Sequence, residues 1–109
     1  MSYGHVKPGD RINLQTLREE LEVDASYALV KTNCMEVIRM ALPKGKTIEE
    51  HSIDSEISVL CLKGEIYFDI DHKAETLTED DWLYLEEGQP FSYSVKKDSI
   101  LLVTIVFGE

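Results

Sequence analysis

Glu49 and His51 are the residues of this chain whose types and spacing are best suited to acid–base chemistry. They lie two positions apart in a segment with strand character, and alternate residues of a strand share a face. A carboxylate beside an imidazole favours the imidazolium and can form a general acid–base pair. We favour the alternative that Glu49 is a solvated charge at the mouth of the fold, because tuned pairs are rarer than chance neighbours.

The same alternation predicts which side chains share the face of His51 and which point the other way. Thr47, Glu49 and Ile53 are predicted on its face, whereas Ile48, Glu50 and Ser52 are predicted on the opposite one. Inward positions of later strands add hydrocarbon and aromatic groups to this set. The residues predicted to bind a ligand are His51, Glu49, Ile53, Ile57, Cys61, Phe91 and Tyr93.

The elements that must position these residues are mostly short strands. Leu14, Leu17 and Leu21 recur at helical spacing and predict a short amphipathic helix, with Asn13 as its cap. From residue 27 onward the period falls toward two, which is typical of strands, and turn residues such as Lys63-Gly64 and Lys97-Asp98 separate the segments. The predicted strands are 27–32, 35–42, 46–52, 56–63, 65–71, 74–78, 82–86, 91–96 and 99–107.

So many strands in one small chain predict a closed or double-sheet architecture, because such folds remove exposed sheet edges. The last segment, residues 100–107, is apolar on both faces, so each face requires a cover. One face would fill the interior, and the other would meet the N-terminal segment or a second subunit. We therefore expect a homodimer.

A glycine and histidine pattern then indicates a family. Gly45, His51 and Gly64 match the first cupin motif, Gly-x5-His-x-His-x3-Glu-x6-Gly, while Ile53 and Ile57 stand where that motif has its second histidine and its glutamate. The chain here resembles the cupin superfamily, in particular its small single-domain members. The resemblance implies an all-β fold, a small cupin-type β-barrel (double-stranded β-helix or jelly roll) preceded by a short N-terminal helical segment.

The second cupin motif, Gly-x5-Pro-x-Gly-x2-His-x3-Asn, is less complete in this chain. In the same register it falls on Asp80, Glu86, Gly88, Phe91 and Val95, of which Gly88 alone matches. The resemblance covers residues 35–107, and a fold-level resemblance does not by itself imply a function.

The substitutions in both motifs bear on metal chemistry. A catalytic transition-metal site requires several nitrogen and oxygen donors that converge and leave one position open. If the register holds, Ile53, Ile57 and Phe91 replace three of the four ligands of the family, and His51 alone remains. We therefore expect no metal and no other cofactor. The interior is predicted either as ordinary packed core or as an apolar pocket that includes His51.

Composition and charge limit the domain count and the partners. The 109 residues are enough for one domain, which we divide into an N-terminal arm and helix over 1–25 and a barrel over 26–109. The formal net charge of -10 opposes binding to nucleic acid and to anionic membranes. The start of the chain has no secretory signal pattern, which predicts a cytoplasmic protein. Cys34 and Cys61 are expected to be buried, reduced thiols.

Three functional hypotheses follow from the sequence. The first is a metal-independent module that binds a small apolar or aromatic molecule near His51. The second is a small enzyme of the oxygenase or isomerase type, which uses His51 either with carboxylate metal ligands such as Glu49 or in a metal-free acid–base pair. The third is a structural or regulatory homodimer with a filled interior. The catalytic residues are unknown, and the chain does not identify the ligand.

Overall fold

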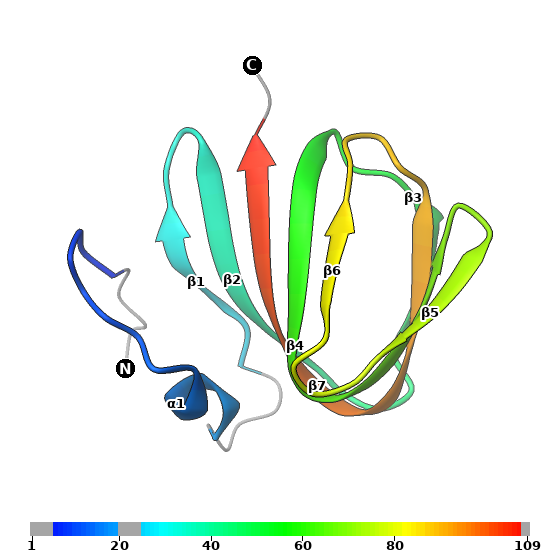
Figure 1. The fold of residues 1–109 in the computed structure, drawn as a ribbon, viewed down its shortest axis with the longest axis horizontal. Coiled ribbons are helices and arrows are strands. Elements are labelled where there is room, and N and C mark those ends of the chain that lie inside the picture. The colour runs from blue at the N-terminus through cyan, green and yellow to red at the C-terminus, as the bar shows by residue number, and fades with distance from the viewer. Residues whose placement is uncertain (1–5, 20–24, 108–109) are drawn as a thin grey trace.

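The computed structural model describes residues 6–19 and 25–107 and consists of one short helix and seven strands. In Figure 1 β1, β2, β6 and the C-terminal part of β7 lie on one side, and β3, β5 and the N-terminal part of β7 lie on the other. The elements are α1 (Leu14–Arg18), β1 (Tyr27–Lys31), β2 (Met35–Leu42), β3 (Thr47–His51), β4 (Ser55–Ile70), β5 (Lys73–Leu77), β6 (Trp82–Leu85) and β7 (Phe91–Phe107).

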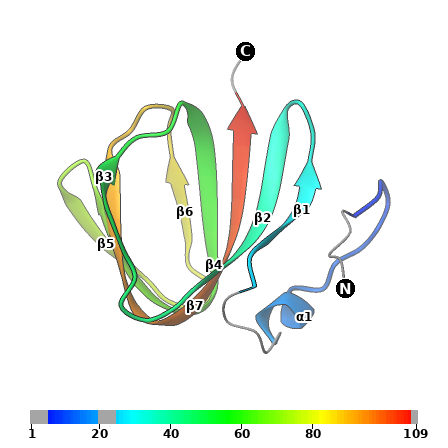
Figure 2. The ribbon, with the colours of Figure 1, turned by 180° about the vertical axis from the view of Figure 1, so that it is seen from behind.

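Two long strands, β4 and β7, run through both halves of the molecule. The C-terminal half of β7 pairs with β2 and with residues 55–63 of β4, while β1 and β6 form the outer edges. The N-terminal half of β7 pairs with β3 and with residues 65–70 of β4, and β5 forms the edge. Figure 2 shows this second half from behind. All pairs are antiparallel, so the predicted all-β jelly roll is confirmed.

The predicted breaks at Lys63-Gly64 and Lys97-Asp98 are wrong, because each pair of expected strands is one bent strand. The ladder between β4 and β7 passes this region through register shifts, which are β-bulges. Gly64 has a φ of 102°, a conformation that favours glycine. The buried Ser99 hydroxyl accepts a hydrogen bond from the Glu65 amide at 3.1 Å, so a side chain satisfies a backbone group at the bulge.

The predicted helix is confirmed over five residues, and its cap is Asn13. The Asn13 side chain accepts a hydrogen bond from the Gln15 amide at 2.8 Å, as an N-cap does. Leu17 is the buried residue of the helix, and it packs on the outer face of the sheet. Leu21, the third leucine of the pattern, lies outside the described residues. The outer cluster that α1 completes consists of Leu17, Leu29, Leu62 and Ile100.

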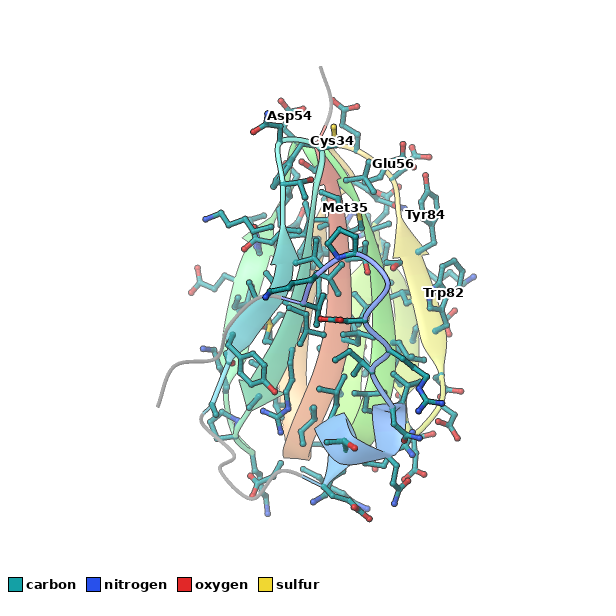
Figure 3. The ribbon with its side chains drawn as sticks, turned by 90° about the vertical axis from the view of Figure 1, so that its left-hand side faces the viewer. Cys34, Met35, Asp54, Glu56, Trp82 and Tyr84 are labelled. Atoms are coloured by element: carbon teal, nitrogen blue, oxygen red, sulfur yellow. The ribbon has the colours of Figure 1, made fainter. Side chains whose placement is uncertain are left out.

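Two arginines attach the N-terminal segment to the sheet. Arg18 donates from Nε to the Leu62 carbonyl oxygen at 2.6 Å and forms an ion pair with Asp80 at 3.0 Å. Arg39, which is fully buried on β2, donates from Nε to the Leu17 carbonyl oxygen at 3.1 Å. Figure 3 shows the N-terminal segment in front of the sheet. The segment therefore covers part of the outer face of β7, as predicted for one of its two faces.

The bend at Gly64 gives a stability test with a matched control. A Cβ atom at Gly64 would lie 2.1 Å from the Ser99 hydroxyl oxygen and 2.6 Å from the Asp98 carbonyl oxygen, whereas one at Gly45 would contact nothing within 4 Å. Both glycines have positive φ, so Gly45→Ala reports backbone strain alone, about 1–2 kcal/mol. We expect Gly64→Ala to lower the free energy of unfolding by about 3 kcal/mol or more, because overlap adds to strain. Urea denaturation of the two variants measures the difference, and equal losses would contradict this account of the bend.

Candidate ligand-binding cavity

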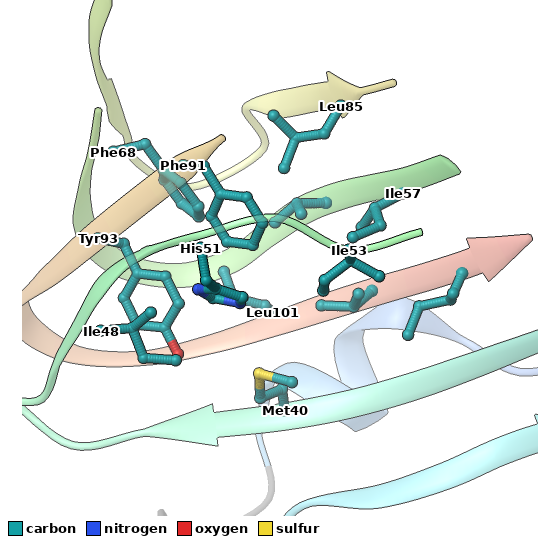
Figure 4. A pocket seen from close by; sticks show the side chains of 13 residues that line it. Met40, Ile48, His51, Ile53, Ile57, Phe68, Leu85, Phe91, Tyr93 and Leu101 are labelled. Atoms are coloured by element: carbon teal, nitrogen blue, oxygen red, sulfur yellow. The ribbon is translucent and has the colours of Figure 1, made fainter. Parts of the chain in front are cut away.

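A cavity of about 130 Å³ lies between the two halves of the barrel. Figure 4 shows its walls, which come from β2, β3, β4, β6, β7 and the segment after β3. None of the lining side chains carries a formal charge if His51 is neutral, and most are hydrocarbon. The lining residues are Met40, Ile48, His51, Ile53, Ile57, Val59, Phe68, Leu85, Phe91, Tyr93, Leu101, Val103 and Ile105.

The four positions that the cupin motifs reserve for metal ligands all face this cavity. They hold His51, Ile53, Ile57 and Phe91, so one nitrogen-bearing side chain stands among three hydrocarbons. Within residues 6–19 and 25–107, no group of three or more His, Cys, Asp or Glu side chains is arranged to hold a metal ion. Hydrocarbons have no lone pairs to donate, and the donor set at these positions therefore does not fit a resident transition metal.

A β-bulge in β3 corrects the predicted faces of this strand. Ile48 pairs with Tyr93 and His51 pairs with Phe91, so three steps along β3 match two steps along β7. The extra residue reverses the alternation, and Ile48 and His51 both line the cavity. The prediction that Ile48 points away from the face of His51 is therefore wrong.

Glu49 does not join His51 as the predicted pair requires. The Glu49 side chain is exposed and does not line the cavity. Its contact with His51 is through the backbone, where Nδ1 of His51 lies 3.1 Å from the Glu49 carbonyl oxygen. In the described part of the chain no ion pair links the Glu49 carboxylate to the imidazole, so the structure offers no acid–base dyad there.

One end of the cavity is aromatic. The ring centroids of His51 and Phe91 are 4.6 Å apart, and Phe68 lies 6.4 Å from Phe91 and 5.4 Å from Tyr93. In Figure 4 these rings lie together, with Ile57 and Leu85 toward the other end. Burial raises the pKa of the Tyr93 hydroxyl. The cavity thus has an aromatic end with two polar groups and an aliphatic end.

Cys61 is buried beneath the cavity wall and does not line it. Its side chain belongs to the inner core cluster and is fully buried, while Val59, two residues earlier, does line the cavity. Burial raises the pKa of the Cys61 thiol to about 11. A thiol that stays protonated at neutral pH is a poor nucleophile. Cys34, predicted to be buried, is instead exposed at the tip between β1 and β2.

Carboxylates gather where the segment after β3 meets the turn before β7. The Gly88 amide donates to the Ile53 carbonyl oxygen at 2.8 Å, which joins the two segments. A hydrogen bond with Asp54, followed by the charge of that residue, raises the pKa of the exposed Glu87. This edge of the molecule therefore carries concentrated negative charge beside Ile53, a lining residue of the cavity.

Several lining residues were absent from the predicted set. Met40, Leu101, Val103 and Ile105 come from β2 and from the last strand, and Phe68 and Leu85 from β4 and β6. Strand alternation alone marks these residues as inward-facing and does not show that they border a gap. The gap depends on the angle between the two halves of the barrel, which the bulges set.

Comparison with known proteins agrees with this architecture. Neither protein-family models nor curated proteins gave a match. Solved structures did match over almost the whole chain. A cupin superfamily protein from Desulfitobacterium hafniense is 17% identical, with a TM-score of 0.79 over 99% of this chain and 100% of its own. The chain has a cupin fold.

Two further structures support the cupin fold. A conserved protein of unknown function from Streptococcus pyogenes is 23% identical, with a TM-score of 0.77 over 100% of this chain and 97% of its own. An RmlC-like cupin from Shewanella frigidimarina is 15% identical, with a TM-score of 0.72 over 77% of this chain and 76% of its own. At these identities the likeness establishes the fold and leaves the function open. No helix among the described residues is long and apolar enough to cross a membrane.

The reactivity of the two cysteines tests whether Cys61 is buried in the core next to the cavity. At pH 8 the exposed Cys34 should react with a disulfide reagent in the native protein, whereas Cys61 should react only after unfolding, because its side chain is buried and burial raises the pKa of its thiol to about 11. Absorbance of the released thiolate counts the equivalents. Cys34→Ser is the control and should show no native reaction. Two equivalents at similar rates from the native protein would contradict the buried placement of Cys61.

Proposed function

We propose that the protein is a metal-independent binding module whose cavity takes a small, largely apolar molecule. The observation that carries the proposal is the apolar cavity itself, with hydrocarbon at three of the four motif positions that face it. Apolar cavities with few polar groups are the usual form of small-molecule sites. The cytoplasmic location and the lack of a cofactor are part of this proposal.

The size of the cavity limits the ligand. An engineered protein cavity of about 150 Å³ lined by aliphatic and aromatic side chains stays dry and binds benzene. The cavity here is about 130 Å³ and has a similar lining. A single ring or a short branched chain therefore fits inside without movement of the walls, and a larger ligand would extend out of the cavity beside the exposed His51.

The enzyme hypothesis gains no specific support from the site. The predicted acid–base pair requires Glu49 and His51 to be in mutual reach, and the Glu49 carboxylate is exposed outside the cavity that His51 lines. A metal-dependent mechanism requires donors that Ile53, Ile57 and Phe91 do not supply. We therefore keep the binding module as the favoured function.

Binding of toluene tests the proposal. We expect toluene at ten times its dissociation constant to stabilise the protein by about 1.4 kcal/mol, a rise in the midpoint temperature of several degrees. Differential scanning fluorimetry measures this rise, with and without a chelator, and the chelator should change neither the rise nor the starting midpoint. Val103→Phe, which fills the cavity, should abolish the rise.

The matched control is Thr76→Phe on β5, where the side chain is exposed and lies outside both the cavity and the proposed dimer surface. This variant should respond to toluene as the unmodified protein does. If the unmodified protein shows no response, or if Val103→Phe responds equally, the cavity is not a binding site. A chelator that lowers the midpoint of the unmodified protein would overturn the metal-independent part of the proposal.

The homodimer remains a prediction, and we propose the surface that would form it. The N-terminal segment covers the lower outer face of the sheet, around Leu62 and Ile100. Above it, Trp82 is 62% exposed and Tyr84 49% exposed on β6, and Val106 is exposed on β7. Figure 3 shows Trp82 and Tyr84 projecting from this face. An exposed apolar surface of this kind is typical of an interface, and a second copy would bury it.

A charge placed on this face tests the dimer. We expect the unmodified protein to elute as a dimer in size-exclusion chromatography with light scattering, and Trp82→Lys to shift it to the monomer because a buried lysine would be desolvated. Tyr67→Lys, at an exposed aromatic residue in the other half of β4, is the control and should leave the dimer intact. A monomeric unmodified protein, or a dimer that survives Trp82→Lys, would contradict the proposed surface.

A further inference from the structure

His51 presents a hydrogen-bond acceptor at the aromatic end of the cavity. Its Nδ1 atom lies 3.1 Å from the Glu49 carbonyl oxygen, and because a carbonyl oxygen can only accept, Nδ1 must carry the hydrogen of this bond. In the neutral ring Nε2 is then an acceptor. No residue in the described part of the chain forms a hydrogen bond with Nε2.

Tyr93 presents a hydroxyl group at the same end. Its side chain is half-buried, and the hydroxyl can both donate and accept. No hydrogen bond from a described residue reaches this hydroxyl, and in Figure 4 its oxygen points toward Ile48 on the cavity wall. His51 is exposed and the Tyr93 hydroxyl is not among the buried atoms that lack a partner, so water reaches both groups and a ligand that enters can hydrogen bond to them in place of water.

The charges around the cavity exclude one class of ligand. The lining contains no lysine or arginine, the carboxylates of Asp54 and Glu87 lie together at the edge next to Ile53, and the chain has a formal net charge of -10. An anionic group would therefore be desolvated without a counter-charge and repelled by its surroundings. A cation would lose its hydration among the hydrocarbon walls, and no carboxylate of the described residues lines the cavity to replace that hydration. The ligand class that fits these groups is therefore neutral.

From these observations we propose that the cavity selects a neutral, hydroxyl-bearing molecule of single-ring size, a phenol-class compound. Its hydroxyl hydrogen bonds to Nε2 of His51, its oxygen accepts from the Tyr93 hydroxyl, and its hydrocarbon body fills the aliphatic end of the cavity. This inference rests on the proposed binding function and specifies the ligand of that same site.

The test compares toluene, phenol and benzoate, which have similar bodies and differ in their polar group. Isothermal titration at neutral pH gives the three dissociation constants for the unmodified protein. Phenol should bind about tenfold more tightly than toluene because two hydrogen bonds exceed the desolvation of one hydroxyl. Benzoate should bind more weakly than toluene. If phenol binds no more tightly than toluene, the inference is wrong, and if toluene still stabilises the protein, the proposed binding function survives.

Two variants remove the polar groups and keep the rings. In the double variant His51→Phe with Tyr93→Phe, the order should reverse, with phenol weaker than toluene, because its hydroxyl would then be buried without a partner. Tyr67→Phe, at an exposed tyrosine outside the cavity, is the matched control and should keep the preference for phenol. Toluene binding to the double variant shows that its cavity is intact. A double variant that binds toluene and still prefers phenol would overturn the inference.

Discussion

The pairing of β4 with β7 is the constraint on which the rest of this structure depends. The two strands are hydrogen-bonded from Ser55 to Ile70 on one side and from Phe91 to Phe107 on the other, so each belongs to both halves of the barrel. Their shared bulges bend them together at Gly64 and Ser99. Because every other strand pairs with β4, with β7 or with β2 beside β7, the bend fixes how far the two halves diverge, and hence the space between them.

The chemistry of the cavity depends on the side chains at the four motif positions, and the cupin fold alone does not determine it. The same four positions could hold a metal if they carried nitrogen and oxygen donors. Ile53, Ile57 and Phe91 instead bring hydrocarbon to the inner surface. Ile57 and Phe91 are buried, and full burial of such a side chain stabilises a protein by about 1.5–3 kcal/mol. This corner of the barrel thus contributes to folding, and one histidine and one tyrosine remain to orient a ligand.

The sequence predicts the elements well and their local irregularities poorly. Residue periodicity and turn residues locate the helix and most of the strands, and the glycine spacing around His51 indicates the fold. What fails is local: Lys63-Gly64 has turn chemistry but forms a bulge, because the long-range pairing with β7 outweighs the local preference. The extra residue between Ile48 and His51 is equally invisible to a period-two pattern. The cavity, which depends on both bulges, could therefore not be predicted as a shape.

The cavity also bears on whether the interior serves only as packed core. Closed residual cavities cost about 24 cal/mol per Å³. The space here, about 130 Å³, is open to solvent beside the exposed His51, so about 3 kcal/mol is an upper bound on its cost relative to a filled interior. Larger side chains at Val59 and Val103, both of which face the space, would remove much of this cost. A chain whose only requirement was stability would gain by such changes. An apolar space beside two polar groups that a ligand can reach, those of His51 and Tyr93, is what a binding site requires and a purely structural core does not.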